Sequence, residues 1–442
     1  MSAARKMKRQ LNSILQWMAK DPSSFVVHPG HDFTRNRILD FETMMRLLIT
    51  FGGQTLRKEI FTAMKDELME IPSASAFCQQ RQKILPCAFY EAFRQFNNET
   101  ADMDCGDEDW YGYIILAVDG TDANISYDPA SDTFIENAGK SYNQFHINAL
   151  YDITNRIYRD CLIEPKSKYN EARAAGEMML RTKVRGRVLL LGDRNYASLN
   201  LFETLNRNNK EYVIRAQSNF IKEFESLPSE EFDKHLVIRI YTSMRDYQKA
   251  LKRSEKNIHY LVGKSKFGKP KKNVTWDYQN GALIGFRIVR FQLSTGEWET
   301  LITNTNSAAF PLERLKHLYS MRWGIETSFR SLKYSIGMTN FHTRNEECIK
   351  QEIYAAMLMY NVTERIISGI VIEQREDCVY EYHVDFSTAS YVIRDFFRTT
   401  KDPPGDLEKR LARYKTPYRP ERHDKRKAVI SKGVIYFMYR VA

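Results

Sequence analysis

Residues 113–122 read YIILAVDGTD, an apolar run that ends in an acidic turn. A second run, VLLLGD, occupies residues 188–193 and ends in the same way. Short, continuously apolar runs of this kind are typical of buried strands. Functional groups gather at the carboxyl ends of strands in open α/β sheets, so Asp119 and Asp193 are candidate ligands for Mg²⁺. The alternative is that each acid only closes a turn after its strand.

The segments around these two runs predict a mixed α/β core. Further strands are expected at residues 145–151, 157–163 and 212–215, and helices at 171–181 and 199–205. Asp122 is a rival to Asp119, but Asp119 is preferred because the first apolar strand is expected to end there.

The first hundred residues are predicted to be helical, with helices near 39–48 and 56–64 and a third from a cap at Ser73 or Ser75 to Lys83. A DNA-binding helix-turn-helix and a plain helical bundle both fit this pattern.

The sequence pattern changes twice in the second half of the chain. Charged loops and two expected strands, 236–241 and 283–293, indicate a β-rich insertion. A single helix is then expected from Pro311 to beyond Lys333, and another over 348–367. A linker at 402–405 precedes a basic tail, in which residues 434–438 are expected to pack as a strand or a helix.

Charge favours a polyanionic partner. The net charge is +11, and the segments Lys252–Lys272 and Lys401–Ala442 each carry +7, although solvated loops have the same composition. Mean hydropathy is −0.51, and no apolar run approaches the roughly 18 residues of a membrane span. The six cysteines are scattered and no secretory signal is recognisable, so we expect an intracellular protein without a disulfide framework.

One expected helix carries four functional side chains on one face. At 100° per residue, Tyr319, Arg322, Glu326 and Lys333 fall within a sector of about 60°. Beside this sector lie three apolar side chains, Ile325, Phe329 and Leu332. An exposed charged surface is the alternative, but the apolar neighbours predict a helix that buries one side and brings the polar face next to the core.

The complete spacing Tyr-x₂-Arg-x₃-Glu-x₆-Lys resembles the signature of the DDE transposases of the insertion-sequence-four family. Residues 118–121 (VDGT) resemble the first-aspartate motif of that family, and residues 192–196 (GDRNY) the second. Asn195 stands where a glycine is common, a mild departure because Asn also tolerates left-handed backbone. Residues 75–81 and 146–152 are similar to further family stretches. The resemblance covers about residues 70 to 365 and not the tail.

The resemblance implies a catalytic and metal-binding triad of Asp119, Asp193 and Glu326 with two Mg²⁺ ions, for which Mn²⁺ would substitute. It implies a DNA transposase that cleaves transposon ends, through hairpins, and joins them to target DNA by two-metal chemistry. The implied partners are double-stranded DNA, with its terminal inverted repeats, and a second subunit in a homodimer; no membrane is involved. The implied location is the bacterial cytoplasm, at the nucleoid when DNA is bound.

Four further residues are implied to bind DNA. Tyr319, Arg322 and Lys333 would hold phosphates of the transposon end. Trp298, in a turn-like stretch, would hold a flipped base; a core or hairpin tryptophan is the alternative.

The fold implied is a ribonuclease-H-like catalytic core interrupted by a β-rich insertion, because 132 residues separate Asp193 from Glu326. The expected parts are a helical DNA-binding region, the first part of the core, the insertion, the second part of the core and a C-terminal region with the basic tail, at 1–105, 106–218, 219–304, 305–367 and 368–442. Alternatives are a transposase-derived DNA-binding protein without catalysis, another ribonuclease-H-like nuclease, and a two-carboxylate sugar hydrolase.

Overall fold

The computed structural model describes residues 2–35, 37–64, 71–260, 279–293, 295–374, 380–398, 405–417 and 438–439. Most of the basic segment 252–272 and most of the basic tail therefore lie outside the described residues. None of the described helices is long and apolar enough to cross a membrane.

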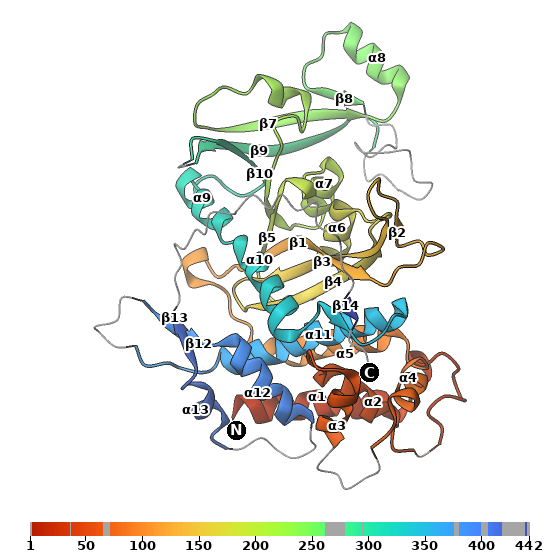
Figure 1. Ribbon diagram of the computed structural model, residues 1–442. Coiled ribbons are helices and arrows are strands. Elements are labelled where there is room, and N and C mark those ends of the chain that lie inside the picture. Colours follow the sequence, from red (N-terminus) through yellow and green to blue (C-terminus); the bar gives the residue numbers. More distant parts are fainter. Residues whose placement is uncertain are drawn as a thin grey trace.

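A large mixed sheet forms the centre of the molecule (Figure 1). Within the described residues its strands follow the order β2-β3-β1-β5-β6-β10-β9-β7-β8, and β4 pairs with β3. The strands are β1 (Ile114–Ile125), β2 (Phe134–Ile135), β3 (Tyr142–Asp152), β4 (Ile157–Pro165), β5 (Val188–Gly192), β6 (Glu211–Arg215), β7 (Phe232–Tyr241), β8 (Ile258–Tyr260), β9 (Ala282–Gln292) and β10 (Trp298–Thr303). The predicted mixed α/β fold is confirmed.

The strands of the predicted core are confirmed, with one correction. β1, β5 and β6 are parallel to one another, and β3 is antiparallel to both β1 and β4. The expectation that the first strand ends at Asp119 is wrong. β1 continues to Ile125 because residues 119–125 keep pairing with β3 after β5, its parallel neighbour, has ended at Gly192.

Alternate side chains of a strand point to opposite faces. Both faces of the core strands carry apolar side chains, and helices cover both. Leu116 and Val118 of β1 pack with α6 (Glu171–Arg181) and α7 (Leu199–Arg207). Ala117 and Ala123 pack on the other face, with α10 (Trp323–Arg330) and α11 (Glu346–Ile367). Odd-numbered residues of β1, including Asp119, therefore face α10.

Helices from both ends of the chain form the lower part of Figure 1. They are α1 (Ala3–Lys20), α2 (Phe41–Thr50), α3 (Leu56–Met64), α4 (Ala74–Arg81), α5 (Pro86–Glu99), α12 (Phe386–Arg398) and α13 (Leu407–Leu411). α11 packs against α1, α2, α5 and α12, so one apolar core joins them to the sheet. The predicted helical N-terminal region is confirmed, and Ser73 is the cap of α4, accepting from the Ala76 amide at 3.1 Å.

The β-rich segment after Asn219 is confirmed and extends the same sheet. β10 pairs antiparallel with β6, and β9 and β7 follow outward, with α8 (Met244–Lys252) at the far end (Figure 1). Two short sheets complete the described structure: β11 (Asn340–Phe341) with β14 (Met438–Tyr439), and β12 (Tyr382–Val384) with β13 (Lys415–Pro417). Met438, predicted to pack as strand or helix, therefore lies in a strand.

The expectation of one continuous helix from Pro311 past Lys333 is wrong. α9 (Leu312–Ser320) ends before Met321, α10 starts at Trp323, and residues Ser331–Ile336 form a π-helical turn. Between α9 and α10 the amides of Met321 and Arg322 bond three residues back, to Leu318 and Tyr319, at 3.1 Å each. This tighter turn changes the angle between successive residues. The uniform 100° per residue used above therefore describes the face of Tyr319, Arg322, Glu326 and Lys333 only approximately.

Candidate active site

The two aspartates lie next to each other because of strand register. In the parallel pair of β1 and β5, the last partners are Val118 and Gly192. Asp119 and Asp193 are the next residues of their two segments, so they lie close together, and the charge of the Asp193 carboxylate acts on that of Asp119. Asp193 also caps a short helical turn, with Oδ1 accepting from the Asn195 amide at 2.8 Å. Asp193 therefore closes a turn, which is the alternative that the sequence left open, and it also lies beside Asp119.

Electrostatics show that these carboxylates are crowded. Burial raises the pKa of Asp119 to about 6; the Gly120 amide and Arg322 oppose this rise, and the charges of Asp193 and Glu326 add to it. Burial also raises the pKa of Asp193. Half-buried acids that repel one another are costly to ionise without a nearby cation, so this site favours a bound positive charge.

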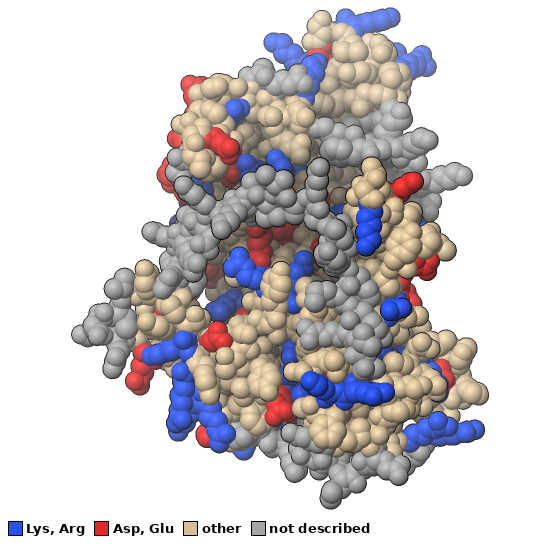
Figure 2. Space-filling model, viewed as in Figure 1, with Lys and Arg blue, Asp and Glu red and all other residues tan. Residues whose placement is uncertain are grey.

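Arg322 supplies such a charge. Its Nη2 donates to Oε1 of Glu326 at 2.9 Å, and its Nη1 lies 3.7 Å from Oδ2 of Asp119. Burial lowers the pKa of Arg322, but Tyr319, Glu326 and Asp119 outweigh that effect and raise it. The guanidinium thus lies between a carboxylate of the sheet and one of α10. In Figure 2 acidic and basic side chains gather in the hollowed middle of the visible face.

Tyr319 and Lys333 flank this centre from both ends of the helical segment. Tyr319 is buried with its ring 5.8 Å from the Arg322 guanidinium. Lys333 Nζ donates to the carbonyl of Asp122 in β1 at 3.2 Å, and burial lowers its pKa. The structure therefore brings together six of the residues singled out from the sequence, along one side of β1.

Trp298 lies apart from that group, as the first residue of β10. The guanidinium of Arg290 lies over its half-buried ring, with Cζ 5.4 Å from the ring centroid. The next residue, Glu299, is buried, and its Oε2 lies 3.4 Å from Nε of Arg215. Burial raises the pKa of Glu299, and Arg215 and Arg322 oppose the rise. The charge of Arg322 therefore acts as far as Glu299 in β10, the strand that begins with Trp298.

Sequence reasoning missed a polar network on the opposite face of β1. Asp122 pairs with His146 of β3, Oδ1 to Nδ1 at 2.6 Å, and with Lys166 at 2.9 Å. Nε2 of His146 lies 3.4 Å from Oε1 of Glu171, at the start of α6. A Cβ atom on Gly120 would meet the His146 ring at 2.5 Å, so the glycine after Asp119 makes room for it. The only available signal was the resemblance of residues 146–152 to a family stretch.

Asp122 and Asp119 have different charged neighbours. Burial raises the pKa of Asp122, but the hydrogen bonds and charges of His146 and Lys166 outweigh that effect and lower the pKa. Asp119 instead faces Arg322 and the other two acids of the proposed triad.

The donor types suit a hard divalent cation, since Asp119 within β1, Asp193 directly after β5 and Glu326 on α10 are all carboxylates. Among the described residues, however, no three His, Cys, Asp or Glu side chains lie close enough together to hold a metal ion. Arg322 separates Glu326 from Asp119, which is one physical reason for that spacing. Metal binding by these acids remains a prediction.

The family described as "Transposase DDE domain" matches residues 110–362, more than half of the chain. A solved structure described as "Cryo-EM structure of piggyBac transposase synaptic complex with hairpin DNA (SNHP)" is similar with a TM-score of 0.43 and 11% identity, over 92% of this chain and 83% of that chain. No curated protein sequence matches.

Proposed function

Because this chain belongs to the transposase DDE domain family, we propose that it cuts transposon ends and joins them to target DNA. The observation that carries this proposal is the guanidinium of Arg322 between Glu326 and Asp119, with Asp193 following the strand that pairs with β1. We further infer that the order β4-β3-β1-β5-β6 is a ribonuclease-H-like core. In this view the insertion of β7 to β10 separates the third acid from the first two.

Each residue then has a chemical task. Asp119, Asp193 and Glu326 would hold divalent cations, Mg²⁺ with Mn²⁺ as substitute. When bound, a pair of such ions supplies activation of water or a 3′ hydroxyl and stabilisation of the leaving oxygen. The high pKa of Asp119 means that its proton is released most readily when a cation is present.

Phosphate positioning falls to the cationic side chains of the same segment. Arg322 can exchange its contacts with Glu326 and Asp119 for a bidentate contact with a phosphate. Lys333 and Tyr319 would hold neighbouring phosphates of the transposon end. Cut-and-paste transposition through hairpin ends, with two copies of the chain pairing the two ends, is the route that we propose.

The test is Glu326→Gln, which keeps the size of the side chain and removes its charge. The variant should lose cleavage and strand transfer on DNA with the element's flanking inverted repeats, yet still bind that DNA. Asp119→Asn and Asp193→Asn should behave alike, because residues that act as a unit are not additive. Arg322→Ala should weaken end binding as well as chemistry. A Glu326→Gln protein that cleaves in Mg²⁺ at a near-normal rate would overturn the assignment.

A further inference from the structure

A groove of about 790 Å³ lies between α3 and α12, and none of the site residues described above lines it. The two helices lie side by side in the lower part of Figure 1, although more than 300 residues separate them in the sequence. The turn at Gly52 and Gly53, before α3, forms one wall. The groove therefore exists only because both ends of the chain fold together.

Positive charge exceeds negative charge among the described lining residues. The cations are Arg57, Lys58, Arg394 and Arg398, and the acids are Glu59 and Asp395. Glu59 is fully buried and already engaged. It accepts from Arg398 at 2.5 Å, and from the amides of Gly52 and Gln54 at 3.0 and 2.8 Å. These contacts already compensate most of the charge of Glu59, so it neutralises little of the charge of the other lining cations.

Arg394 carries the charge that is least compensated. Its side chain is only 6% exposed, and its Nη2 donates to a neutral acceptor, the carbonyl of Ile336, at 2.9 Å. No carboxylate of the described residues lies within 4 Å of its guanidinium. Burial lowers the pKa of Arg394 to about 10, since Glu59 offsets the burial only in part and Arg398 repels it. An anion that enters the groove would relieve this cost.

The rim shows what kind of anion fits. Arg57 and Lys58 are exposed on α3, and two aromatic side chains, Phe61 and Tyr391, are 56% and 71% exposed. Cations interleaved with exposed aromatics are typical of surfaces that follow a nucleic-acid backbone. Residues 65–70, which include three acids, lie outside the described residues.

We infer that the groove between α3 and α12 binds the phosphodiester backbone of duplex DNA, at a distance from the acids that cut it. This inference rests on the proposed function for its substrate class. Arg57 and Lys58 contact phosphates from the rim, and Arg394 provides the fixed charge of the wall. The groove supplies binding energy that is independent of base sequence.

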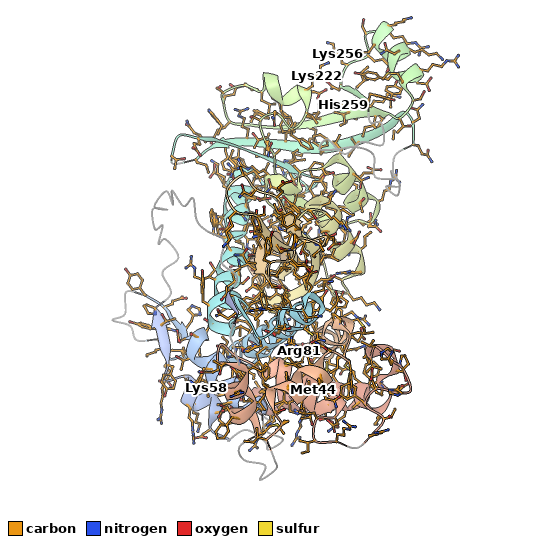
Figure 3. The ribbon with its side chains drawn as sticks, turned by 45° about the vertical axis from the view of Figure 1, so that its right-hand side comes forward. Met44, Lys58, Arg81, Lys222, Lys256 and His259 are labelled. Carbon is orange, nitrogen blue, oxygen red and sulfur yellow. The ribbon has the colours of Figure 1, made fainter. Side chains whose placement is uncertain are left out.

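The test is the salt dependence of binding to a labelled duplex of mixed sequence, with the full chain. The double variant Arg57→Gln/Lys58→Gln should bind more weakly, and the slope of log K against log salt should fall by about 1.8, as for the loss of two phosphate contacts. The matched control is Arg245→Gln/Lys249→Gln, one exposed arginine and one exposed lysine on α8. Figure 3 labels Lys58 at one end of the molecule and Lys256, just after α8, at the other.

The outcomes separate the two proposals. An unchanged slope in the double variant, or an equal fall of the slope in the control variant, overturns the proposal that the groove binds DNA. Cleavage of flanking-repeat DNA is measured in parallel on the unmodified protein. If cleavage is absent but the slope falls only in the double variant, the DNA-binding groove is supported and the catalytic proposal fails. If the DNA is cleaved but the slope of the double variant is unchanged, the catalytic proposal is supported and the groove proposal fails.

Discussion

At the residue scale, the site combines acids that are unfavourable to bury with one arginine that partly compensates them. Arg322 contacts Glu326 at 2.9 Å and approaches Asp119 at 3.7 Å, but Asp193 has no such cation within 4 Å among the described residues. Groups arranged for function commonly reduce stability in this way. The site should therefore be measurable through stability as well as through activity.

The first residue-scale prediction concerns Asp119 and pH. Folding raises the pKa of Asp119 from 3.8 to about 6, so the native state binds a proton more tightly than the unfolded chain does. Stability is then lost as pH rises from about 4 to about 6, and the loss is complete above that range. In metal-free buffer, Asp119→Asn should stabilise the protein at pH 8 by up to about 3 kcal/mol, and the difference should vanish near pH 4.

Urea unfolding of the two proteins at several pH values provides the measurement. Asp132→Asn is the control, because this exposed acid only pairs with Lys168 at the surface. A destabilising effect of Asp119→Asn at pH 8 would show that the ionised Asp119 does not reduce the stability of the fold.

The second residue-scale prediction concerns Trp298. If its ring holds a flipped base, Trp298→Ala should impair hairpin formation while sparing the first nick. Gel analysis of nicked, hairpin and resolved DNA would separate the steps. Trp17→Ala is the control, since Trp17 is an exposed tryptophan on α1. An equal decrease of both steps, or unfolding of the Trp298 variant alone, would leave Trp298 a structural residue of the β9–β10 hairpin.

At the element scale, β1 carries charged side chains on both faces. Asp119 faces α10, and Asp122 on the other face holds His146 against Gly120. The strand can serve both faces because β3 supports it beyond the end of β5. A change on the His146 side should therefore reach the acid on the other side.

Gly120→Ala tests that link. The added methyl would lie 2.5 Å from His146 Nε2, a buried ring held in place by Asp122, so we expect a destabilisation of about 1–3 kcal/mol. Gly285→Ala in β9 is the matched control, because its methyl would lie at an ordinary 3.8 Å from Val237. Removing the ring as well, in Gly120→Ala/His146→Ala, should recover part of the loss. Equal stability of the two single variants, measured by urea unfolding, would refute the close packing.

At the scale of the whole molecule, the helical N-terminal region is built into the core. Phe77, Phe89, Phe93 and Phe96 are fully buried and belong to the same apolar cluster as α10 and α11. Each buried phenylalanine contributes about 2 kcal/mol, so the four together rival the whole stability of a typical domain.

We therefore predict that residues 106–442 do not fold when produced alone. The fragment should lack a cooperative unfolding transition and should expose apolar surface to a dye such as ANS. Supplying residues 1–105 as a separate chain is the control, and it should restore the transition. Cooperative unfolding of 106–442 by itself would show that the boundary at residue 105 separates independent domains.

Local sequence patterns were sufficient for the position of β5, the start of β1, the β-rich segment and the helices α2, α3, α4 and α11, because periodicity and capping act over a few residues. The spacing of Tyr319, Arg322, Glu326 and Lys333 also indicated one functional side of a helical segment. The tight turn at Met321 and the π turn after Arg330 could not be predicted, since hydrogen-bond slips of one residue leave the apolar pattern nearly unchanged.

Only the tertiary structure decided which side chains meet across long separations. The register of β1 with β5 placed Asp119 beside Asp193, packing of α10 on β1 brought Arg322 between two acids, and pairing with β3 set His146 under Gly120. The groove of α3 and α12 likewise joins distant segments. These contacts depend on strand register and on the summed burial of the whole core, which no short stretch of sequence contains.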